Sequence, residues 1–220
     1  MVWESFKLSI LVVTVATIVI ATLGLALGLL FAKGRFFGRE LLGSFFTLPL
    51  VLPPTVTGFF LIVLFGRHGL IGAPIYDLTG WTVAFTWQAA VIAAVVLALP
   101  LMVLSARAAI ESVNPQYEIA SYTLGKGQLA TFFRITLPLA RRGIFAGIVL
   151  SFTRALGEFG ATFMLAGNIP GKTQTMPLAI YEAVISGDNK QAQVLALILT
   201  GVSVVAVYLT AKLTRGALRY

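Results

Sequence analysis

The sequence predicts an all-α membrane protein with five membrane-spanning helices, organised as one domain over residues 1–220. Of the 220 residues, 58% are hydrophobic and only 11% are charged. A soluble domain carries about 25% charged residues, so this chain has too few charges to cover a water-facing surface of its size. Five apolar stretches are long enough to cross a bilayer, and no internal repeat or low-complexity linker divides the chain.

Each predicted span contains the roughly 20 mostly apolar residues that a helix needs to cross the hydrocarbon core. The spans cover residues 8–32, 41–65, 83–106, 143–166 and 192–211. The first is interpreted as a retained helix rather than a signal peptide, because it lacks a basic N-terminal region and its apolar stretch is too long. A further apolar run, Met176–Ser186, is too short to cross and is expected to be interfacial or re-entrant.

Five spans place the two termini on opposite sides of the membrane, and the distribution of Lys and Arg decides the orientation. The loops after the first and third spans, with the C-terminal tail, hold 11 of the 16 Lys and Arg residues, and the opposite side holds four. The eleven are Lys33, Arg35, Arg39, Arg107, Lys126, Arg134, Arg141, Arg142, Lys212, Arg215 and Arg219. The N-terminus is therefore predicted outside and the C-terminus in the cytoplasm. Cationic cytoplasmic loops also account for the net charge of +8, so no nucleic-acid partner is predicted.

Residues 166–173, AGNIPGKT, resemble the end of a phosphate-binding P-loop, G-x-x-x-x-G-K-[ST]. However, Ala166 occupies the first glycine position, and the segment follows a predicted membrane helix rather than a strand. It also lies on the predicted outer side, away from cytoplasmic ATP. Asn168, Pro170 and Gly171 are turn-forming residues, so they predict a simple turn after the fourth span.

The predicted cytoplasmic loop over residues 107–142 is too long and too patterned for a plain connector. Asn114 can cap a helix, Pro115 suits its first turn, and Gly125 can end it, which predicts a short helix over residues 115–124. Its exposed surface is expected to contain Tyr117, Glu118, Ile119, Ala120 and Tyr122. Such a helix is either part of a solvated loop or a knob that fits a groove in another protein.

The second half of this loop begins with an amphipathic run, Gln128–Thr136, which Pro138 is expected to break before the fourth span. The whole loop is similar to the EAA loop, E-A-A-x-x-x-G-x9-I-x-L-P, of the membrane subunits of binding-protein-dependent ABC importers. The matching residues are Ala120, Gly125, Ile135, Leu137 and Pro138. Ile119 and Ser121 replace the Glu and the second Ala of the pattern, and Glu118 stands one residue early.

The resemblance extends over nearly the whole chain. The stretches LPLVLPPTVTGFFLIVLFG and LGEFGATFMLAGNIPGKTQTMPLAIY, with the five-span layout, are similar to molybdate permease subunits. Sulfate/thiosulfate and tungstate permeases share parts of these stretches and stay open as alternatives. The resemblance implies a type I ABC importer permease (MetI-like) fold in the cytoplasmic (inner) membrane, where the chain would translocate molybdate delivered by an external binding protein.

The resemblance also implies the partners. Two copies of the permease would form the pathway, two ATPase subunits would dock on the loop and bind ATP and Mg, and an extracytoplasmic oxyanion-binding protein would deliver the ion. This chain itself would hold no cofactor and catalyse no reaction. The implied ATPase-coupling residues are Tyr117, Glu118, Ile119, Ala120, Ser121, Gly125, Leu137 and Pro138.

Charged residues and prolines inside two spans are candidates for the ion pathway or its gate. Arg154 and Glu158 are four residues apart, so on one helix they would share a face and could pair. An Arg at the bilayer centre costs roughly 2.5–3.5 kcal/mol on insertion scales, so Arg154 is expected to face protein or water. The pair either fixes packing or belongs to the pathway. Pro53 and Pro54, followed by Thr55, either kink a packing helix or expose backbone to a cavity.

Other chemistries lack the residues that they need. The chain has no cysteine and a single histidine, His68, so no metal site is predicted. No serine has a nearby base in the sequence for a hydrolase triad. A stand-alone channel or secondary transporter is the alternative class, although neither would need a capped cytoplasmic helix.

Overall fold

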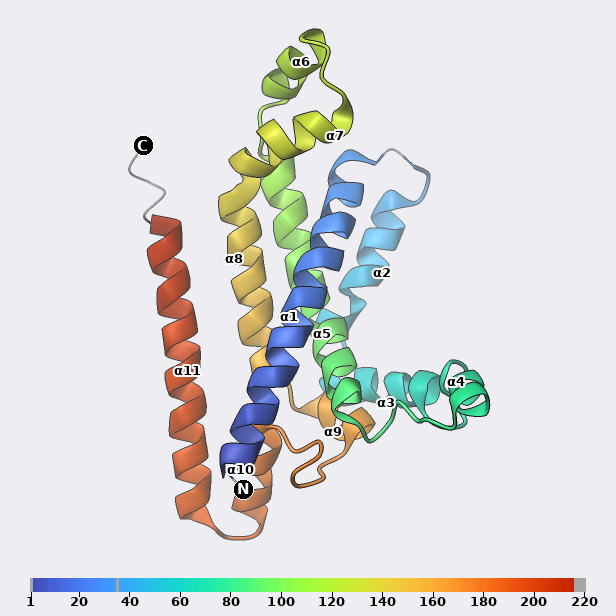
Figure 1. Cartoon of the computed structure of the whole chain (residues 1–220), viewed down its shortest axis with the longest axis vertical. Coiled ribbons are helices and arrows are strands. Elements are labelled where there is room, and N and C mark those ends of the chain that lie inside the picture. The colour runs from blue at the N-terminus through green and yellow to red at the C-terminus, as the bar shows by residue number, and fades with distance from the viewer. Residues whose placement is uncertain (1, 35, 216–220) are drawn as a thin grey trace.

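The computed structural model describes residues 2–34 and 36–215, and the regular elements in those ranges are all helices (Figure 1). In chain order they are α1 (Val2–Lys33), α2 (Arg39–Val51), α3 (Pro54–Phe65), α4 (Gly72–Thr79), α5 (Trp87–Glu111), α6 (Pro115–Thr123), α7 (Gln128–Thr131), the π-helix η1 (Phe132–Thr136), α8 (Leu137–Leu156), α9 (Gly160–Ala166), α10 (Met176–Ile185) and α11 (Asn189–Arg215). The predicted fold class, an all-helical membrane protein, is confirmed.

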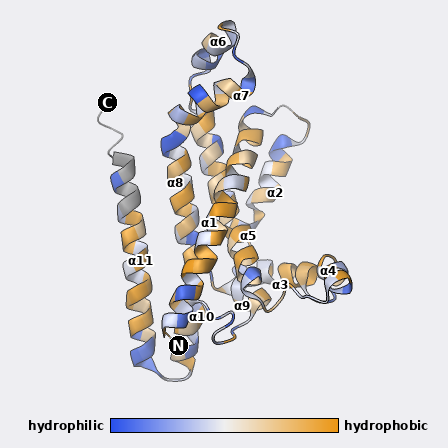
Figure 2. Cartoon of the chain, viewed as in Figure 1, coloured by the Kyte–Doolittle hydropathy of each residue, from blue (hydrophilic) through white to orange (hydrophobic). Residues whose placement is uncertain are grey.

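Within the described residues, four helices are long and apolar enough to cross a membrane: α1, α5, the run from α7 through α8, and α11. The span predicted over residues 41–65 is instead a pair of helices, α2 and α3, bent by 113°. Pro53 and Pro54 explain the break, because each lacks an N–H and disfavours a helical conformation in the residue before it. Figure 2 shows that the middles of the long helices are apolar and that polar residues gather towards their ends.

The packed centre of the bundle is formed by α1, α5 and α8. Small residues let these helices approach closely, as is usual between membrane helices. A Cβ added to Gly28 of α1 would lie 2.6 Å from the Cβ of Ala106 on α5. A Cβ added to Gly147 of α8 would lie 2.7 Å from the Cβ of Ser105, which is also on α5. The three helices therefore form the closely packed body to which the other elements attach.

Two further spans differ from their predicted limits. The third, predicted over residues 83–106, starts only after Thr86, because the Thr86 side chain caps α5 by accepting the Ala89 N–H (3.3 Å). The fourth, predicted over residues 143–166, is not one helix. Residues 157–159 are non-helical, and α9 is a separate helix beyond them.

Pro138 does not break the helix that leads into the fourth span, contrary to the prediction. The elements α7, η1 and α8 form one continuous helical run. Within η1 the Leu137 N–H bonds to the Phe132 carbonyl, five residues back, so the backbone is wound more widely there. The wider turn relieves the clash that a proline ring would otherwise make with the preceding turn of an α-helix.

The two ends of the bundle carry different elements. The end of α1, the start of α2, the helices α6 and α7, and the end of α11 gather at one end, whereas the start of α1, α9 and α10 lie at the other (Figure 1). The basic loops predicted to be cytoplasmic therefore share one end. Arg35 and Arg219, which belong to the predicted cytoplasmic set, lie outside the described residues.

Candidate functional site

The short helix α6 is fixed at both ends. Its start is capped by Asn114, whose side-chain oxygen accepts the Gln116 N–H (3.0 Å). Its end is closed by Gly125 at φ +74, with the Gly125 N–H bonded to the Tyr122 carbonyl (2.9 Å). The helix ends at Thr123, one residue earlier than predicted. These caps make α6 a stiff element at the tip of the molecule (Figure 1).

The side chains of α6 divide into an exposed set and a buried set. Tyr117 and Ile119 are 57% and 58% exposed, and Tyr122 is exposed as well. Glu118 and Ser121, by contrast, are buried. The prediction that Glu118 belongs to the exposed surface is therefore wrong, because its side chain turns towards the bundle.

Glu118 binds two other elements. Its Oε2 forms an ion pair with Lys33 Nζ at the end of α1 (2.7 Å), and its Oε1 accepts a hydrogen bond from Thr136 Oγ1 in η1 (2.6 Å). Burial raises the pKa of this carboxyl, but the two hydrogen bonds and the Lys33 charge together lower its pKa below the usual value. Glu118 is therefore an anion at neutral pH. Ser121 and Thr131 add a buried hydroxyl–hydroxyl bond (2.8 Å) between α6 and α7.

A groove of about 680 Å³ lies between α6 and the start of α8. It is lined by Tyr117, Ala120, Ser121, Leu124, Lys126, Arg134, Ile135, Pro138 and Leu139. Four of the predicted coupling residues thus meet there: Tyr117, Ala120, Ser121 and Pro138. Leu137 instead packs against the core of the bundle. The groove is mostly apolar and carries two basic side chains, which suits an apolar partner segment with acidic neighbours.

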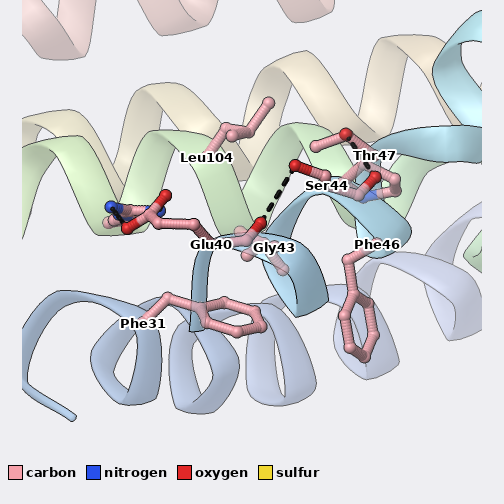
Figure 3. A pocket seen from close by; sticks show the side chains of 10 residues that line it. Phe31, Glu40, Gly43, Ser44, Phe46, Thr47 and Leu104 are labelled. Carbon is pink, nitrogen blue, oxygen red and sulfur yellow. Dashed lines mark hydrogen bonds and ion pairs between the residues drawn. The ribbon is translucent and has the colours of Figure 1, made fainter. Parts of the chain in front are cut away.

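Sequence reasoning missed an ion-pair cluster at the same end of the bundle. Arg107 on α5 binds Glu40 on α2 (Nη2–Oε1, 3.0 Å) and Glu111 on its own helix (Nε–Oε1, 2.9 Å). Figure 3 shows Glu40 beside a small pocket of about 190 Å³ between α1, α2 and α5, lined also by Phe31 and Leu104. The cluster joins α2, which has no buried residue, to α5. The four-residue spacing of Arg107 and Glu111 is the sequence signal that could have predicted their ion pair.

The predicted pathway residues lie around the two helix breaks. Arg154 Nη1 pairs with Glu158 Oε2 (2.6 Å), as the spacing predicts, but Arg154 lies in the last turn of α8 and Glu158 lies in the break beyond it. The pairing was predicted correctly, but the prediction that both residues share one helix face is wrong, because Glu158 lies outside α8. Glu158 Oε1 also accepts the Ala161 N–H (2.9 Å), which caps α9. The side chain of Glu158 is 2% exposed and that of Arg154 is 30% exposed.

The first break lies beside the second. Pro54 is the first residue of α3, and a Cβ added to Gly160 of α9 would lie 2.9 Å from the Cβ of Pro54 and 3.4 Å from the Thr55 nitrogen. Thr55 and Pro53 are exposed in the single chain. The structure thus brings the prolines and the Arg154–Glu158 pair of two distant segments to one region of the fold.

The AGNIPGKT segment forms a closed turn. The N–H groups of Lys172, Thr173 and Gln174 all point to the Ile169 carbonyl, within 2.9 to 3.1 Å. Thr173 Oγ1 accepts the Ile169 N–H (3.0 Å). These donors are used within the turn itself, so they are not free to surround a phosphate, and the predicted turn is confirmed.

Residues 24–218 match the family of binding-protein-dependent transport system inner membrane components. The chain belongs to this permease family. The permease is 42% identical over 214 residues to the molybdenum transport system permease protein ModB of Escherichia coli (strain K12), covering 97% of this chain and 93% of the relative. It is 33% identical over 210 residues to the sulfate transport system permease protein CysW of Synechococcus elongatus, covering 96% and 73%.

The fold of the permease is that of a known importer. Its structure superposes on a chain of the inward-facing MetNI methionine ABC transporter with a TM-score of 0.73, at 15% identity, covering 98% of this chain and 93% of the other. The predicted MetI-like fold is confirmed. Family membership also makes the permease a non-catalytic, multi-pass component of the inner membrane, with an ATPase and a periplasmic binding protein as partners and no cofactor expected in this chain.

Proposed function

We propose that this permease is the membrane subunit of an ATP-driven importer of molybdate, delivered by an external binding protein. The observation that carries the proposal is the 42% identity to a molybdenum transport permease along 97% of the chain. Identity to a sulfate permease is lower, at 33% over a similar length. Sulfate/thiosulfate or tungstate import is the second candidate, because these ions are, like molybdate, tetrahedral oxyanions that carry two negative charges.

The groove between α6 and α8 is proposed as the surface that receives the ATPase subunit. Its lining is mostly apolar and is presented by a helix that is capped at both ends, so a docked partner would move α6 as a unit. The side chains of Tyr117 and Ile119 on α6, and of Leu124 at its end, are exposed to solvent. The end of the bundle that holds this groove also holds the basic loops, which supports its cytoplasmic location and an external N-terminus.

The region around the two helix breaks is proposed as part of the ion pathway or its gate. Within the described residues, Arg154 has a bonding partner only for Nη1, so its remaining N–H groups are available to an anion. Glu158 offsets part of that charge. A structural pair that only fixes α9 is the alternative. If Arg154→Ala inserts and folds normally yet transports at the wild-type rate, the pathway role is wrong.

A second copy of the chain is proposed to complete the pathway. The helix α3 is apolar on all sides, yet Phe59, Phe60 and Val63 are about half exposed in the single chain. The exposed prolines at the start of α3 adjoin this surface. A neighbouring permease chain would cover these residues, and cross-linking of single cysteines introduced at Phe59 or Phe60 would detect it.

The proposal is tested by purifying the chain from its native membranes in a gentle detergent and identifying its near-stoichiometric partners. Recovery of an ATPase and a binding protein that retains molybdate is the expected result. A binding protein that retains sulfate or tungstate would move the proposal to the second candidate. Purification of the chain without either partner would contradict the importer and favour a channel or secondary transporter.

A further inference from the structure

The helix α6 projects from the bundle, and polar side chains anchor it there (Figure 1). It packs against α7 and η1. One anchor is the bond between Ser121 and Thr131 on α7 (2.8 Å). The other is Glu118, whose two oxygens reach two different elements: Lys33 at the end of α1 (2.7 Å) and Thr136 in η1 (2.6 Å).

These bonds turn Glu118 away from any docking partner. Both of its oxygens are occupied, and its side chain is 11% exposed. The groove that receives a partner contains Tyr117 and Ala120 but not Glu118. Glu118 instead lines a separate cavity of about 530 Å³, together with Lys33 and Thr136. One short helix therefore presents its docking residues and its anchoring carboxylate to different cavities.

The ion pair with Lys33 connects α6 to α1, a helix that is not its neighbour along the chain. Lys33 is the last residue of α1, and α1 packs along α5 and α8. Gly28 holds α1 close to α5, because a Cβ there would lie 2.6 Å from Ala106. A displacement applied to Lys33 is therefore delivered to the close-packed centre of the bundle. The Thr136 contact delivers the same displacement to α8, which follows η1 directly.

We propose that Glu118 is a positioning residue that carries movement of α6 to α1 through Lys33, and that it is not a contact to the ATPase. The inference rests on the proposed function, since it takes α6 as the helix on which the ATPase docks. A short ion pair suits this role, because charge-assisted hydrogen bonds are directional and stronger than neutral ones. Breaking the pair leaves the docking groove intact but disconnects it from α1.

The test uses the whole transporter, purified with its ATPase and reconstituted in proteoliposomes with the molybdate-loaded binding protein. The variants are Lys33→Ala, Glu118→Gln and the exchanged pair Lys33→Glu with Glu118→Lys. Glu118→Gln keeps the shape of the side chain and one of its two acceptor oxygens, which favours normal folding. The control is Arg142→Ala, which removes an exposed cation on α8 that has no bonding partner among the described residues. The measurements are the ATPase that co-purifies and the molybdate taken up per ATP hydrolysed.

The ATPase is expected to co-purify with every variant, as it does with the wild type. Molybdate uptake per ATP should fall by roughly threefold to tenfold in Lys33→Ala and Glu118→Gln. It should recover substantially in the exchanged pair and stay at the wild-type value in Arg142→Ala. A merely structural role for Glu118 would lower the yield of protein without changing this ratio.

Two outcomes would overturn the inference: wild-type uptake per ATP in both single variants, or loss of the ATPase from Glu118→Gln but not from Lys33→Ala. The second would make Glu118 a docking contact. Failure of the wild-type chain to bind any ATPase is a different result, because it would contradict the proposed function itself.

Discussion

The chain breaks a membrane helix twice, and the two breaks are built differently. Between α2 and α3 the chain bends by 113° at consecutive prolines, and no side chain caps α3. Between α8 and α9 the break is held by Glu158, which pairs with Arg154 and accepts the Ala161 N–H. The first break therefore depends on the covalent geometry of proline, and the second depends on a charge pair.

Because the two breaks are built differently, amino-acid substitutions should affect them differently. A proline disfavours a continuous helix whatever surrounds it, whereas a buried pair needs both partners in place. The breaks are nevertheless one structural unit, because α3 packs on α9 through Gly58 and Gly160. Substitutions at the contact should affect both breaks, and substitutions within one break should reveal which mechanism holds it.

The largest effect is expected at the contact between the two breaks. A Cβ added to Gly58 would lie 2.8 Å from the Ala161 Cα and 2.7 Å from the Met164 Cβ. Because the Ala161 backbone cannot move aside cheaply, Gly58→Leu should lower the free energy of unfolding by about 3 kcal/mol or more. Thermal unfolding in detergent measures this. Gly43→Ala is the matched control, since its Cβ would lie 3.8 Å from Arg107 and meet nothing closer. Equal melting temperatures would contradict the close contact.

Removal of the Glu158 carboxylate should have the next largest effect. Glu158→Ala leaves Arg154 unpaired and the Ala161 N–H uncapped, at a cost of about 2–4 kcal/mol in unfolding free energy, lower than for a fully buried pair because Arg154 is partly exposed. Glu158→Gln retains an acceptor for the N–H and should recover part of the loss. If both variants melt at the same temperature, the cap is not what stabilises this break.

Replacement of the prolines should change the geometry of the first break more than its stability. The double variant Pro53→Ala and Pro54→Ala removes the bias against a continuous helix, with a net stability change of about 1 kcal/mol or less. The bend between α2 and α3 should then vary from molecule to molecule. Spin labels at the exposed residues Phe45 and Phe60 would report a broader distance distribution. An unchanged, narrow distribution would show that packing, not proline, sets the bend.

The smallest effect on stability is expected at Thr55. Its side chain is exposed and, among the described residues, makes no hydrogen bond, so Thr55→Val should change the unfolding free energy by about 0.5 kcal/mol or less. If Thr55 lines the pathway, molybdate uptake should fall although the melting temperature does not. Thr55→Ser, which keeps the hydroxyl, should transport normally. Wild-type uptake by Thr55→Val would remove Thr55 from the pathway.

The sequence predicted those features that depend on neighbouring residues. Asn114, Pro115 and Gly125 each act on the adjacent backbone, and they located α6 to within one residue. The turn at AGNIPGKT was predicted for the same reason. The break at Pro53 was also visible in the sequence, but its angle of 113° was not, because a proline disfavours a continuous helix without fixing the direction in which the chain leaves it.

The sequence did not predict the features that depend on distant partners. Glu118 was expected on the exposed surface of α6, because its partner Lys33 lies 85 residues earlier in the chain. The second break was hidden because residues 143–166 are mostly apolar, and Gly157 and Gly160 are their only backbone signals near the break. The attachment of α2 by Arg107 and Glu40 likewise joins residues 67 positions apart.

The most direct test of the coupling account is ATP-driven molybdate uptake by reconstituted proteoliposomes that contain the permease, its ATPase and the binding protein. Gly125→Val is the informative variant, because a β-branched residue is strongly disfavoured at φ +74, and Gly125→Asn is its control, because Asn tolerates that conformation. The account predicts ATP-dependent uptake by the wild type and by Gly125→Asn, and almost none by Gly125→Val although that variant inserts in the membrane. Normal uptake by Gly125→Val, or uptake by the wild-type chain without ATP, would contradict it.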